Sequence, residues 1–314
     1  MAFDAQSYHK PILAEKCIEF LNVRQGGIYV DCTAGGGGHS ALILEKLSGK
    51  GKLLAFDKDD DAIRFCAKRF EGCGSVELIK SDFKNAARFL AEKGLKPDGI
   101  LMDLGISSHQ IDEKSRGFSY MSRDSALDMR MDRIQSLTAK EILNEYDERK
   151  IFEIVRDYGE EKFASKIAKN IVAFRTVQPI ETTGQLNDII DASIPLSVRK
   201  KGGHPAKRTY QALRIAVNGE LDGLGEAIKE LALSLRAGGR MVVLSFHSLE
   251  DRIVKSSFRK NENPCICPSH FPVCVCGNVS KGKVITRKPI LPSEEELTVN
   301  SRSKSAKLRI FERA

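Results

Sequence analysis

The sequence lacks any long uninterrupted run of apolar residues. No stretch approaches the roughly eighteen consecutive apolar residues that a membrane-spanning helix needs. Its first residues, Met1-Ala-Phe-Asp4, have neither the basic start nor the apolar core of a secretory signal peptide. These absences argue against membrane insertion and secretion, so we expect a soluble, cytoplasmic protein with no membrane partner.

The sequence also lacks a complete dinucleotide-binding fingerprint, although four consecutive glycines occur from Gly35 to Gly38. A dinucleotide-binding fingerprint requires G-x-G-x-x-G between a strand and a helix. If Gly35 and Gly37 are the first two glycines, the third position is occupied by Ser40, and the neighbouring frame also meets no glycine. The sequence therefore disfavours a nicotinamide dehydrogenase, which we keep as a minor alternative.

The residues around these glycines predict a strand, a tight turn and a helix. Ile28 to Val30 is a short β-branched and aromatic run, Asp31 ends it, and apolar residues recur at helical spacing from 41 to 47. Glycines allow a ligand to lie against the backbone, and a helix start presents unpaired amides. The motif Asp31-x-x-x-Gly35-x-Gly37 suits an adenosyl ligand with an amino acid tail, S-adenosylmethionine (AdoMet). A turn without a ligand is disfavoured, because four glycines cost chain entropy and offer no packing.

Length and charge set broad limits on the protein. The 314 residues suffice for one large domain or two modest ones, and a hydrophobic content of 41% supports a packed core. Lysine and arginine number 50 against 42 acidic residues, a formal charge of +8. This balance favours polyanionic partners such as nucleic acid.

Strands and helices alternate through the first third of the chain. Strands are predicted at 28–30, 53–56, 76–79 and 99–102, with helices between them, and this alternation indicates an α/β fold with a doubly wound, mostly parallel sheet. Ligands of such sheets bind beyond the carboxyl ends of the strands. The residues that follow each strand are therefore the candidates for the site.

Two of these strand ends carry candidate ligand contacts. Asp57 follows the second strand, where a carboxylate can accept hydrogen bonds from both ribose hydroxyls of a nucleoside. The neighbouring acids at 59–61 are expected in the first turn of a helix, where carboxylates favour the helix dipole. After the third strand, Asp82 and Phe83 either flank an adenine ring or serve as a helix cap and a core residue, and the sequence leaves both open.

The alternation stops after the fourth strand. Residues 112–206 contain no convincing buried strand and predict helices at 139–146, 150–157, 162–175 and 183–192. A further strand appears only at 239–245. We therefore expect a methyltransferase-like first part at 1–111, an inserted helical substrate-recognition domain at 112–207, and the second part of the α/β domain at 208–314.

Two basic segments frame this insertion. Residues 114–123 interleave cations with Phe118 and Tyr120, and residues 199–208 hold five cations beside a pair of glycines. Cations contact phosphates and aromatic rings stack on unpaired bases, which is how single-stranded RNA is held. A solvated loop is the alternative for either segment alone, but two of them at one insertion favour RNA binding.

The carboxyl-terminal part contributes one further site candidate. His247 follows the strand at 239–245, and Ser248 with Asp251 predicts a capping box for the next helix. The position of His247 makes it a candidate ligand or base, with an ordinary structural histidine as the alternative. Farther on we expect a cationic strand near 283–287, an acidic turn at 294–296 and an edge strand at 306–311.

Eight cysteines divide into two groups. Four are scattered, and thiols of an intracellular chain are expected to stay reduced. The others form two C-x-C pairs separated by six residues, Cys265, Cys267, Cys274 and Cys276. Four close thiols suit one tetrahedral structural zinc, with His270 as a substitute ligand, although C-x-C is less diagnostic than C-x-x-C.

Several segments together resemble the MraW family, the small-subunit ribosomal RNA methyltransferases H. The likeness runs nearly end to end and rests on the segments 31–40 and 103–110, Arg116-Gly-Phe-Ser, Asp128-Met-Arg-Met-Asp and Ser245-Phe-His-Ser-Leu-Glu-Asp-Arg. It implies a class I AdoMet-dependent methyltransferase fold that methylates the exocyclic amine (N4) of a cytidine in the decoding region of 16S ribosomal RNA. A non-catalytic RNA-binding protein with a relict cofactor fold is the alternative.

The resemblance also implies particular site residues. The AdoMet contacts of the family fall at Gly37, Gly38, His39, Asp57, Phe83, Asp103 and Gln110. Catalysis of this kind consists mostly of aligning the amine and accepting its protons, and we expect Asp103 and His247 to take these roles. The [DNS]-P-P-[FY] motif of many amine methyltransferases is replaced here by Asp103-Leu-Gly-Ile. The cysteine cluster is not general in the family, so methyl transfer should need no metal.

Overall fold

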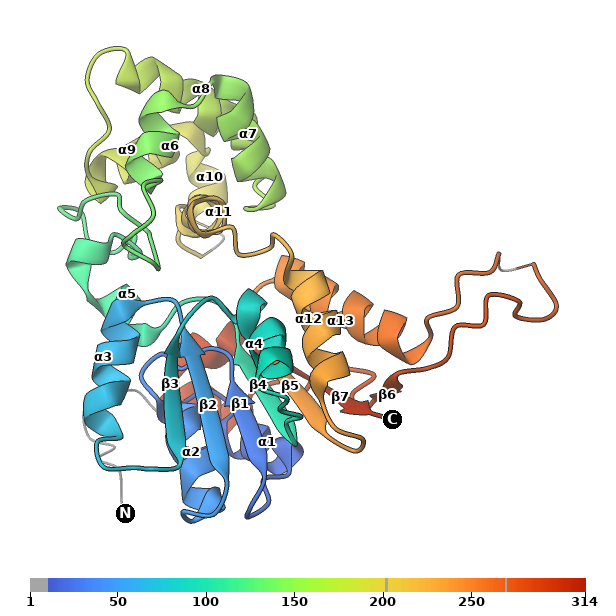
Figure 1. Cartoon of the computed structure of the whole chain (residues 1–314). Coiled ribbons are helices and arrows are strands. Elements are labelled where there is room, and N and C mark those ends of the chain that lie inside the picture. The colour runs from blue at the N-terminus through green and yellow to red at the C-terminus, as the bar shows by residue number, and fades with distance from the viewer. Residues whose placement is uncertain (1–10, 201–202, 269) are drawn as a thin grey trace. The chain divides into compact units, whose positions relative to one another are not determined.

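The computed structural model describes residues 11–200, 203–268 and 270–314. The chain folds into two compact units (Figure 1). One, the sheet unit, comprises Met1–Gly105 and Leu221–Ala314, and the other, the helical unit, comprises Ile106–Glu220. Within the described ranges, we find no helix with the length and apolar character needed to cross a membrane.

The sheet unit is built on one seven-stranded sheet in the order β3-β2-β1-β4-β5-β7-β6. Its strands are β1 (Ile28–Asp31), β2 (Lys52–Asp57), β3 (Val76–Lys80), β4 (Gly99–Asp103), β5 (Arg240–Ser245), β6 (Gly282–Val284) and β7 (Lys307–Arg313). The first five pair in parallel, and β7 runs antiparallel to β5 and β6. Strand order reverses between β1 and β4, and ligands of open α/β sheets bind at this reversal.

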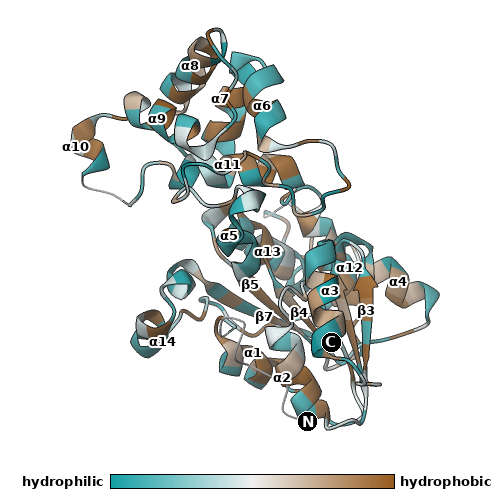
Figure 2. Cartoon of the chain, turned by 90° about the vertical axis from the view of Figure 1, so that its left-hand side faces the viewer, coloured by the Kyte–Doolittle hydropathy of each residue, from teal (hydrophilic) through white to brown (hydrophobic). Residues whose placement is uncertain are grey.

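Helices cover both faces of this sheet and enclose two hydrophobic cores. The helices are α1 (Ala14–Leu21), α2 (Gly38–Leu47), α3 (Asp60–Arg69), α4 (Ala86–Glu92), α12 (Leu224–Ser234), α13 (Ser248–Glu262) and α14 (Glu294–Val299), with short 3₁₀ helices at Phe83–Asn85 (η1) and Ser301–Ser305 (η3). Because successive strand residues point to opposite faces, Leu53 joins the core under α1 and α2, and Leu54 joins the core under α4 and α12. The strands are mostly hydrophobic in Figure 2. This arrangement confirms the predicted doubly wound α/β fold.

Two details of the carboxyl-terminal segment differ from the sequence expectation. The strand at 306–311, expected at a sheet edge, is β7 and lies inside the sheet between β5 and β6. The short strand β6 forms the edge instead, and the buried run of β7 fits an interior position. The acidic segment expected as a turn at 294–296 begins helix α14, whose first turn favours carboxylates.

The helical unit consists of short helices around a core of its own. They are α5 (Ser108–Asp112), η2 (Lys114–Arg116), α6 (Ala139–Glu145), α7 (Glu148–Asp157), α8 (Ala164–Arg175), α9 (Thr183–Ser193), α10 (Leu196–Arg199) and α11 (Lys207–Asn218). All the helices expected between 139 and 192 are present. Helix α11, which we had assigned to the second part of the α/β domain, packs against α6 and α7 instead. The unit is therefore longer at both ends than the predicted insertion at 112–207.

Candidate active site

The glycine turn leaves β1 at the point where strand order reverses. Gly37 caps α2 with a φ of +71°, a left-handed conformation that favours glycine. A Cβ atom on Gly37 would lie 2.8 Å from the ring of Phe70, and one on Gly38 would lie 2.8 Å from the ring of Pro11. Neither position accepts a side chain without displacement of its neighbour. The turn therefore keeps bare backbone beside the first amides of α2, as an adenosyl ligand requires.

Asp57 connects the end of β2 to this turn. Its carboxylate accepts hydrogen bonds from the backbone N–H of Gly35 at 2.7 Å and from that of Asp59 at 2.8 Å. Burial raises the pKa of Asp57 to about 6. The acids that follow have the expected structural role: Asp59 caps α3 by accepting from the N–H of Asp61, and Asp60 and Asp61 lie in its first turn.

Asp31 has a buried partner that the sequence did not reveal. Its carboxylate accepts a hydrogen bond from the hydroxyl of Ser40 at 2.6 Å and one from the N–H of Thr33 at 3.1 Å. Both Asp31 and Ser40 are fully buried, and burial raises the pKa of Asp31. Ser40 occupies the position where a dinucleotide fingerprint would place glycine, so the residue that excludes one ligand class also anchors α2 to β1.

His39 and Asp103 face each other across the reversal point. His39 Nε2 lies 3.4 Å from Asp103 Oδ2, and the N–H of Asp103 donates to Thr33 Oγ1 at 2.7 Å. Burial alone would lower the pKa of His39, but Asp103 and then Asp31 raise it, and the net shift is upward. Among the described residues, neither ring nitrogen of His39 nor Oδ1 of Asp103 has a hydrogen-bond partner. Buried polar atoms usually have hydrogen-bond partners, so these atoms could accept hydrogen bonds from a ligand or donate them to it.

In the segment after β3, Asp82 is a helix cap and Phe83 packs against a hydrophobic core, as the structural alternative predicted. Asp82 caps η1 by accepting from the N–H of Lys84 at 2.9 Å, and Lys58 Nζ lies 3.7 Å from its carboxylate. Phe83 is partly buried and packs against the core under α4. These contacts do not test an adenine contact by Phe83, which stays a prediction.

His247 has a role at the start of α13 that corrects the predicted capping box. The cap is His247 itself, one residue before Ser248: its Nδ1 accepts from the N–H of Glu250 at 3.4 Å, and the Glu250 carboxylate accepts from the N–H of His247. Ser248 is thus the first helical residue, and Asp251 instead pairs with Arg309 and Lys307. His247 Nε2 lies 3.2 Å from the buried Glu250 carboxylate, but this contact does not have the geometry of a hydrogen bond.

Gln110 belongs to the helical unit. It is buried and forms a capping box with Ser107 at the start of α5, where its side-chain oxygen accepts from the N–H of Ser107 at 3.0 Å. Its predicted contact with AdoMet is not tested by this arrangement.

The first basic segment is less available to RNA than we expected. Arg116 is fully buried and donates to the carbonyls of Arg130 and Met131 at 2.9 and 3.0 Å, and Phe118 lies in the core of the helical unit. This corrects their assignment as RNA contacts. Tyr120 stacks on His204 of the second segment with ring centroids 4.5 Å apart. The two segments thus meet, although Lys201, one of the five cations, lies outside the described residues.

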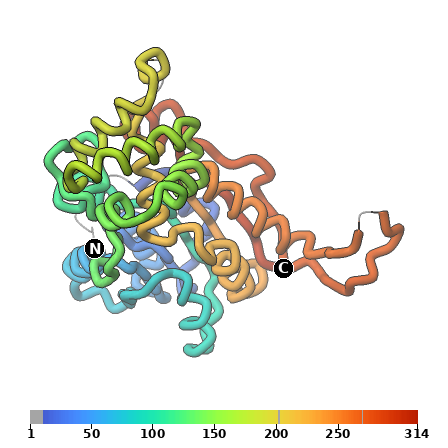
Figure 3. The backbone as a smooth tube through the Cα atoms, turned by 90° about the horizontal axis from the view of Figure 1, so that it is seen from above, coloured from blue at the N-terminus to red at the C-terminus, as the bar shows by residue number. Residues whose placement is uncertain are grey.

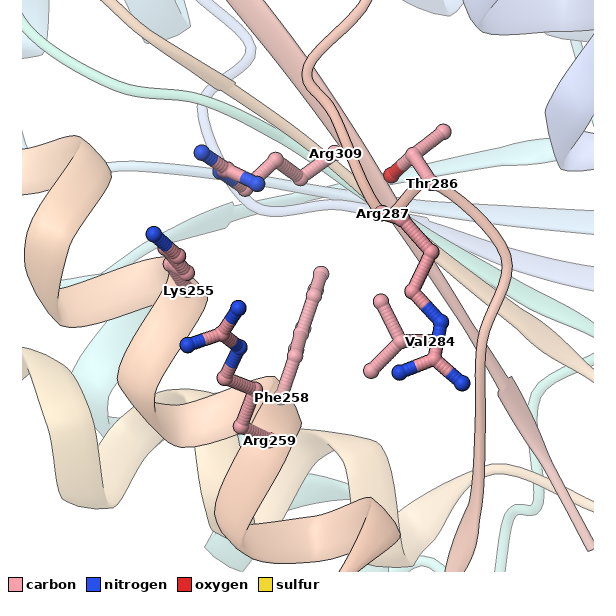
Figure 4. A pocket seen from close by; sticks show the side chains of 7 residues that line it. All are labelled: Lys255, Phe258, Arg259, Val284, Thr286, Arg287 and Arg309. Carbon is pink, nitrogen blue, oxygen red and sulfur yellow. The ribbon is translucent and has the colours of Figure 1, made fainter.

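A cationic pocket lies in the sheet unit between α13, β6 and β7. Its lining includes Lys255 and Arg259, one turn apart on α13, with Arg287 and Arg309 around the buried ring of Phe258 (Figure 4). Arg309 is neutralised by Asp251 at 2.6 Å, and Arg287 lies 3.2 Å from Glu262. Lys255 and Arg259 have no ion-pair partner among the described residues, so they carry uncompensated charge at this surface.

Comparison with known proteins agrees with this geometry. Residues 6–314 match the model of the MraW methylase family. The chain is 56% identical to Ribosomal RNA small subunit methyltransferase H 2 of Agathobacter rectalis over 307 residues, which cover 97% of this chain and 98% of that one. It is 54% identical to the methyltransferase H of Lachnospira eligens over the full length of both, and 52% identical to that of Clostridium botulinum strain Kyoto over 96% and 97% of the two chains. The chain belongs to the MraW methylase family.

Proposed function

We propose that the protein transfers a methyl group from AdoMet to the exocyclic N4 amine of a cytidine in the decoding region of 16S ribosomal RNA. The names of its relatives, small-subunit ribosomal RNA methyltransferases, support the substrate class. The proposal for this chain rests on the glycine turn Gly35–Gly38, which we call the glycine cradle. It lies where strand order reverses between β1 and β4, with Asp57 and Asp103 at the ends of the neighbouring strands.

The residues of the sheet unit at this cradle have the chemistry that AdoMet needs. Gly37 and Gly38 leave room for an adenosyl group against the backbone, and Asp57 stands where its carboxylate can accept hydrogen bonds from ribose hydroxyls. The buried polar atoms of His39 and Asp103 that lack partners suit the polar methionine tail. Phe83 and Gln110 stay predicted AdoMet contacts that rest on the family resemblance alone. When bound, AdoMet supplies a methyl group that its sulfonium has already activated.

The chain's own task is then alignment and proton acceptance. The lone pair of the cytosine amine is delocalised into its ring, so a carboxylate that accepts an N–H hydrogen bond favours the nucleophilic form. We assign this role to Asp103 and the final acceptance of the proton to His247. In the transfer the S–CH₃ bond breaks, the N–CH₃ bond forms, and the amine loses one proton. His247 would accept that proton at Nδ1. In the structure this atom accepts a hydrogen bond from the N–H of Glu250, but at a long distance of 3.4 Å.

Binding of the RNA requires cations outside the cradle. Lys255 and Arg259 offer uncompensated charge in the sheet unit, and we assign them phosphate contacts. The helical unit would select the substrate, and the cytidine must be unpaired or flipped to reach the amine acceptor. No step here uses a metal, so a metal at the cysteine cluster would have a structural role only.

The test is transfer of tritiated methyl from AdoMet to small-subunit particles that lack this modification, followed by nucleoside analysis. We expect label in N4-methylcytidine, none on particles already modified, and loss of at least 100-fold in rate with Asp103→Asn. RNA binding without transfer would instead support the non-catalytic alternative. Label in any other nucleoside would overturn the assignment of the substrate.

A further inference from the structure

The described residues between α13 and β6, 263–268 and 270–281, form an arm without helices or strands. This arm projects from the sheet unit in two views (Figures 1 and 3). Its apolar side chains do not form a core, because Ile266, Val273 and Val275 are 80%, 69% and 72% exposed. A segment of this length without a core needs another source of folding energy, such as a disulfide or a metal.

Four thiols converge in this arm. The Sγ atom of Cys274 lies 3.5 Å from that of Cys265, 3.9 Å from that of Cys267 and 3.4 Å from that of Cys276, and Cys265 and Cys276 are 3.9 Å apart. All four sulfurs lie within 4.8 Å of one another. No disulfide joins these cysteines.

These separations match a particular coordination geometry. Four sulfurs at the usual Zn–S distance of about 2.3 Å from a tetrahedral ion are about 3.8 Å from each other. The observed separations of 3.4–3.9 Å scatter around that value. In addition, the backbone N–H of Val275 points to Cys267 Sγ at 3.3 Å, a contact that stabilises thiolate sulfur.

We propose that Cys265, Cys267, Cys274 and Cys276 bind one Zn²⁺ ion that folds the arm. Four thiolates favour a soft or borderline metal over Mg²⁺ or Ca²⁺, and Zn²⁺ is the usual occupant of a closed tetrathiolate site. Four protein ligands leave no position for water or substrate, so the ion is structural. His270, a substitute ligand in the sequence prediction, is not among the four groups that converge. This inference is independent of the proposed methyl transfer.

The experiment measures metal content in the full-length protein, purified under reducing conditions without chelators. We expect one zinc per chain by elemental analysis, and replacement by Co²⁺ should give the charge-transfer bands of a tetrahedral cobalt thiolate. Cys267→Ser should lower zinc content and make the arm the first site of limited proteolysis. Cys73→Ser, which changes a partly buried thiol outside the arm, is the matched control and should leave both unchanged.

Folding of the variants is checked independently of the metal. Because the arm lies outside both hydrophobic cores, Cys267→Ser should retain AdoMet affinity and the main unfolding transition. Reduced, folded protein without stoichiometric metal would overturn the proposal. So would two disulfides among the four cysteines, or iron in place of zinc in protein from zinc-replete cells.

Discussion

The carboxylate of Asp57 accepts a hydrogen bond from the backbone N–H of Gly35 at 2.7 Å, so the end of β2 holds the turn that leaves β1. One acid thus shapes the glycine cradle and faces the proposed ribose. A carboxylate with two backbone donors is also fixed in orientation, which reduces the entropy lost when a ligand binds.

Asp57→Asn should weaken AdoMet binding roughly 10- to 100-fold, since a hydrogen bond to a charged group contributes about 1.5–3 kcal/mol. An amide group also cannot accept from both backbone donors. The measurement is calorimetric titration with AdoMet. Asp60→Asn is the matched control, because Asp60 lies three residues on, in the first turn of α3, and pairs with Lys80 at 2.6 Å. Equal affinity of the Asp57 variant and the unaltered protein would contradict the ribose assignment.

The raised pKa of Asp57 gives an unusual pH dependence of stability. Burial raises this pKa from 3.8 to about 6, so the folded protein holds the proton more tightly than the unfolded chain does. The contribution of Asp57 to the free energy of unfolding therefore falls as pH rises from about 4 to about 6, by about 3 kcal/mol at most. Denaturant unfolding of Asp57→Asn and the unaltered protein tests this. The variant should gain relative stability toward neutral pH, and a constant difference would refute the shift.

The pair of His39 and Asp103 predicts a second pH effect. Burial lowers the pKa of His39, but Asp103, Asp31 and Glu296 together raise it above its ordinary value, so Asp103→Asn should move that pKa down. A histidine whose pKa is raised in the folded state contributes to the free energy of unfolding at pH values below its unfolded-state pKa. This contribution disappears as pH rises through its folded-state pKa. Titration of the imidazole by NMR measures the shift. His109→Gln changes a partly buried histidine on α5 of the other unit and should leave the His39 titration unchanged.

The sequence predicted those features of the site that depend on local pattern. The strand ends at Asp57 and Asp103 and the glycine turn follow from alternation and from the backbone demands of a tight turn, so they could be located in advance. The hydrogen bond from Ser40 to Asp31 could not be located in advance. Ser40 lies on a different element, and no sequence pattern marks its hydroxyl as the partner of Asp31. His247 was missed as a cap because histidine seldom occupies that position.

Arg116 illustrates the opposite error. The sequence pattern of a cation between other cations and an aromatic ring predicts an RNA contact, yet the guanidinium of Arg116 is buried and donates to two backbone carbonyls. Local composition does not distinguish a solvated arginine from one that anchors a loop, because the difference lies in carbonyls fourteen and fifteen residues away. Long-range backbone geometry therefore limited the prediction at this position.

Arg116→Met should destabilise the helical unit by roughly 2–4 kcal/mol, because two buried carbonyls lose their donors. Methionine keeps the aliphatic stem, so the loss reports the contacts of the guanidinium group. Hydrogen exchange of residues 129–131 measures it locally. Lys114→Met changes an exposed cation in the same segment and should have little effect on exchange. Weakened RNA binding with undisturbed exchange would restore Arg116 as a direct contact.

Lys255 and Arg259 provide the test of RNA contact in the sheet unit. If each contacts a phosphate, the double variant Lys255→Glu with Arg259→Glu should weaken binding of the substrate RNA and lower the slope of log affinity against log salt by about 1.4–1.8. AdoMet affinity should not change, since neither residue lies at the cradle. Lys229→Glu is the control, because Lys229 is exposed on α12 and already paired with Glu226 at 2.8 Å. An unchanged salt slope in the double variant would show that the RNA does not reach this pocket, and the phosphate contacts would then have to lie elsewhere on the chain.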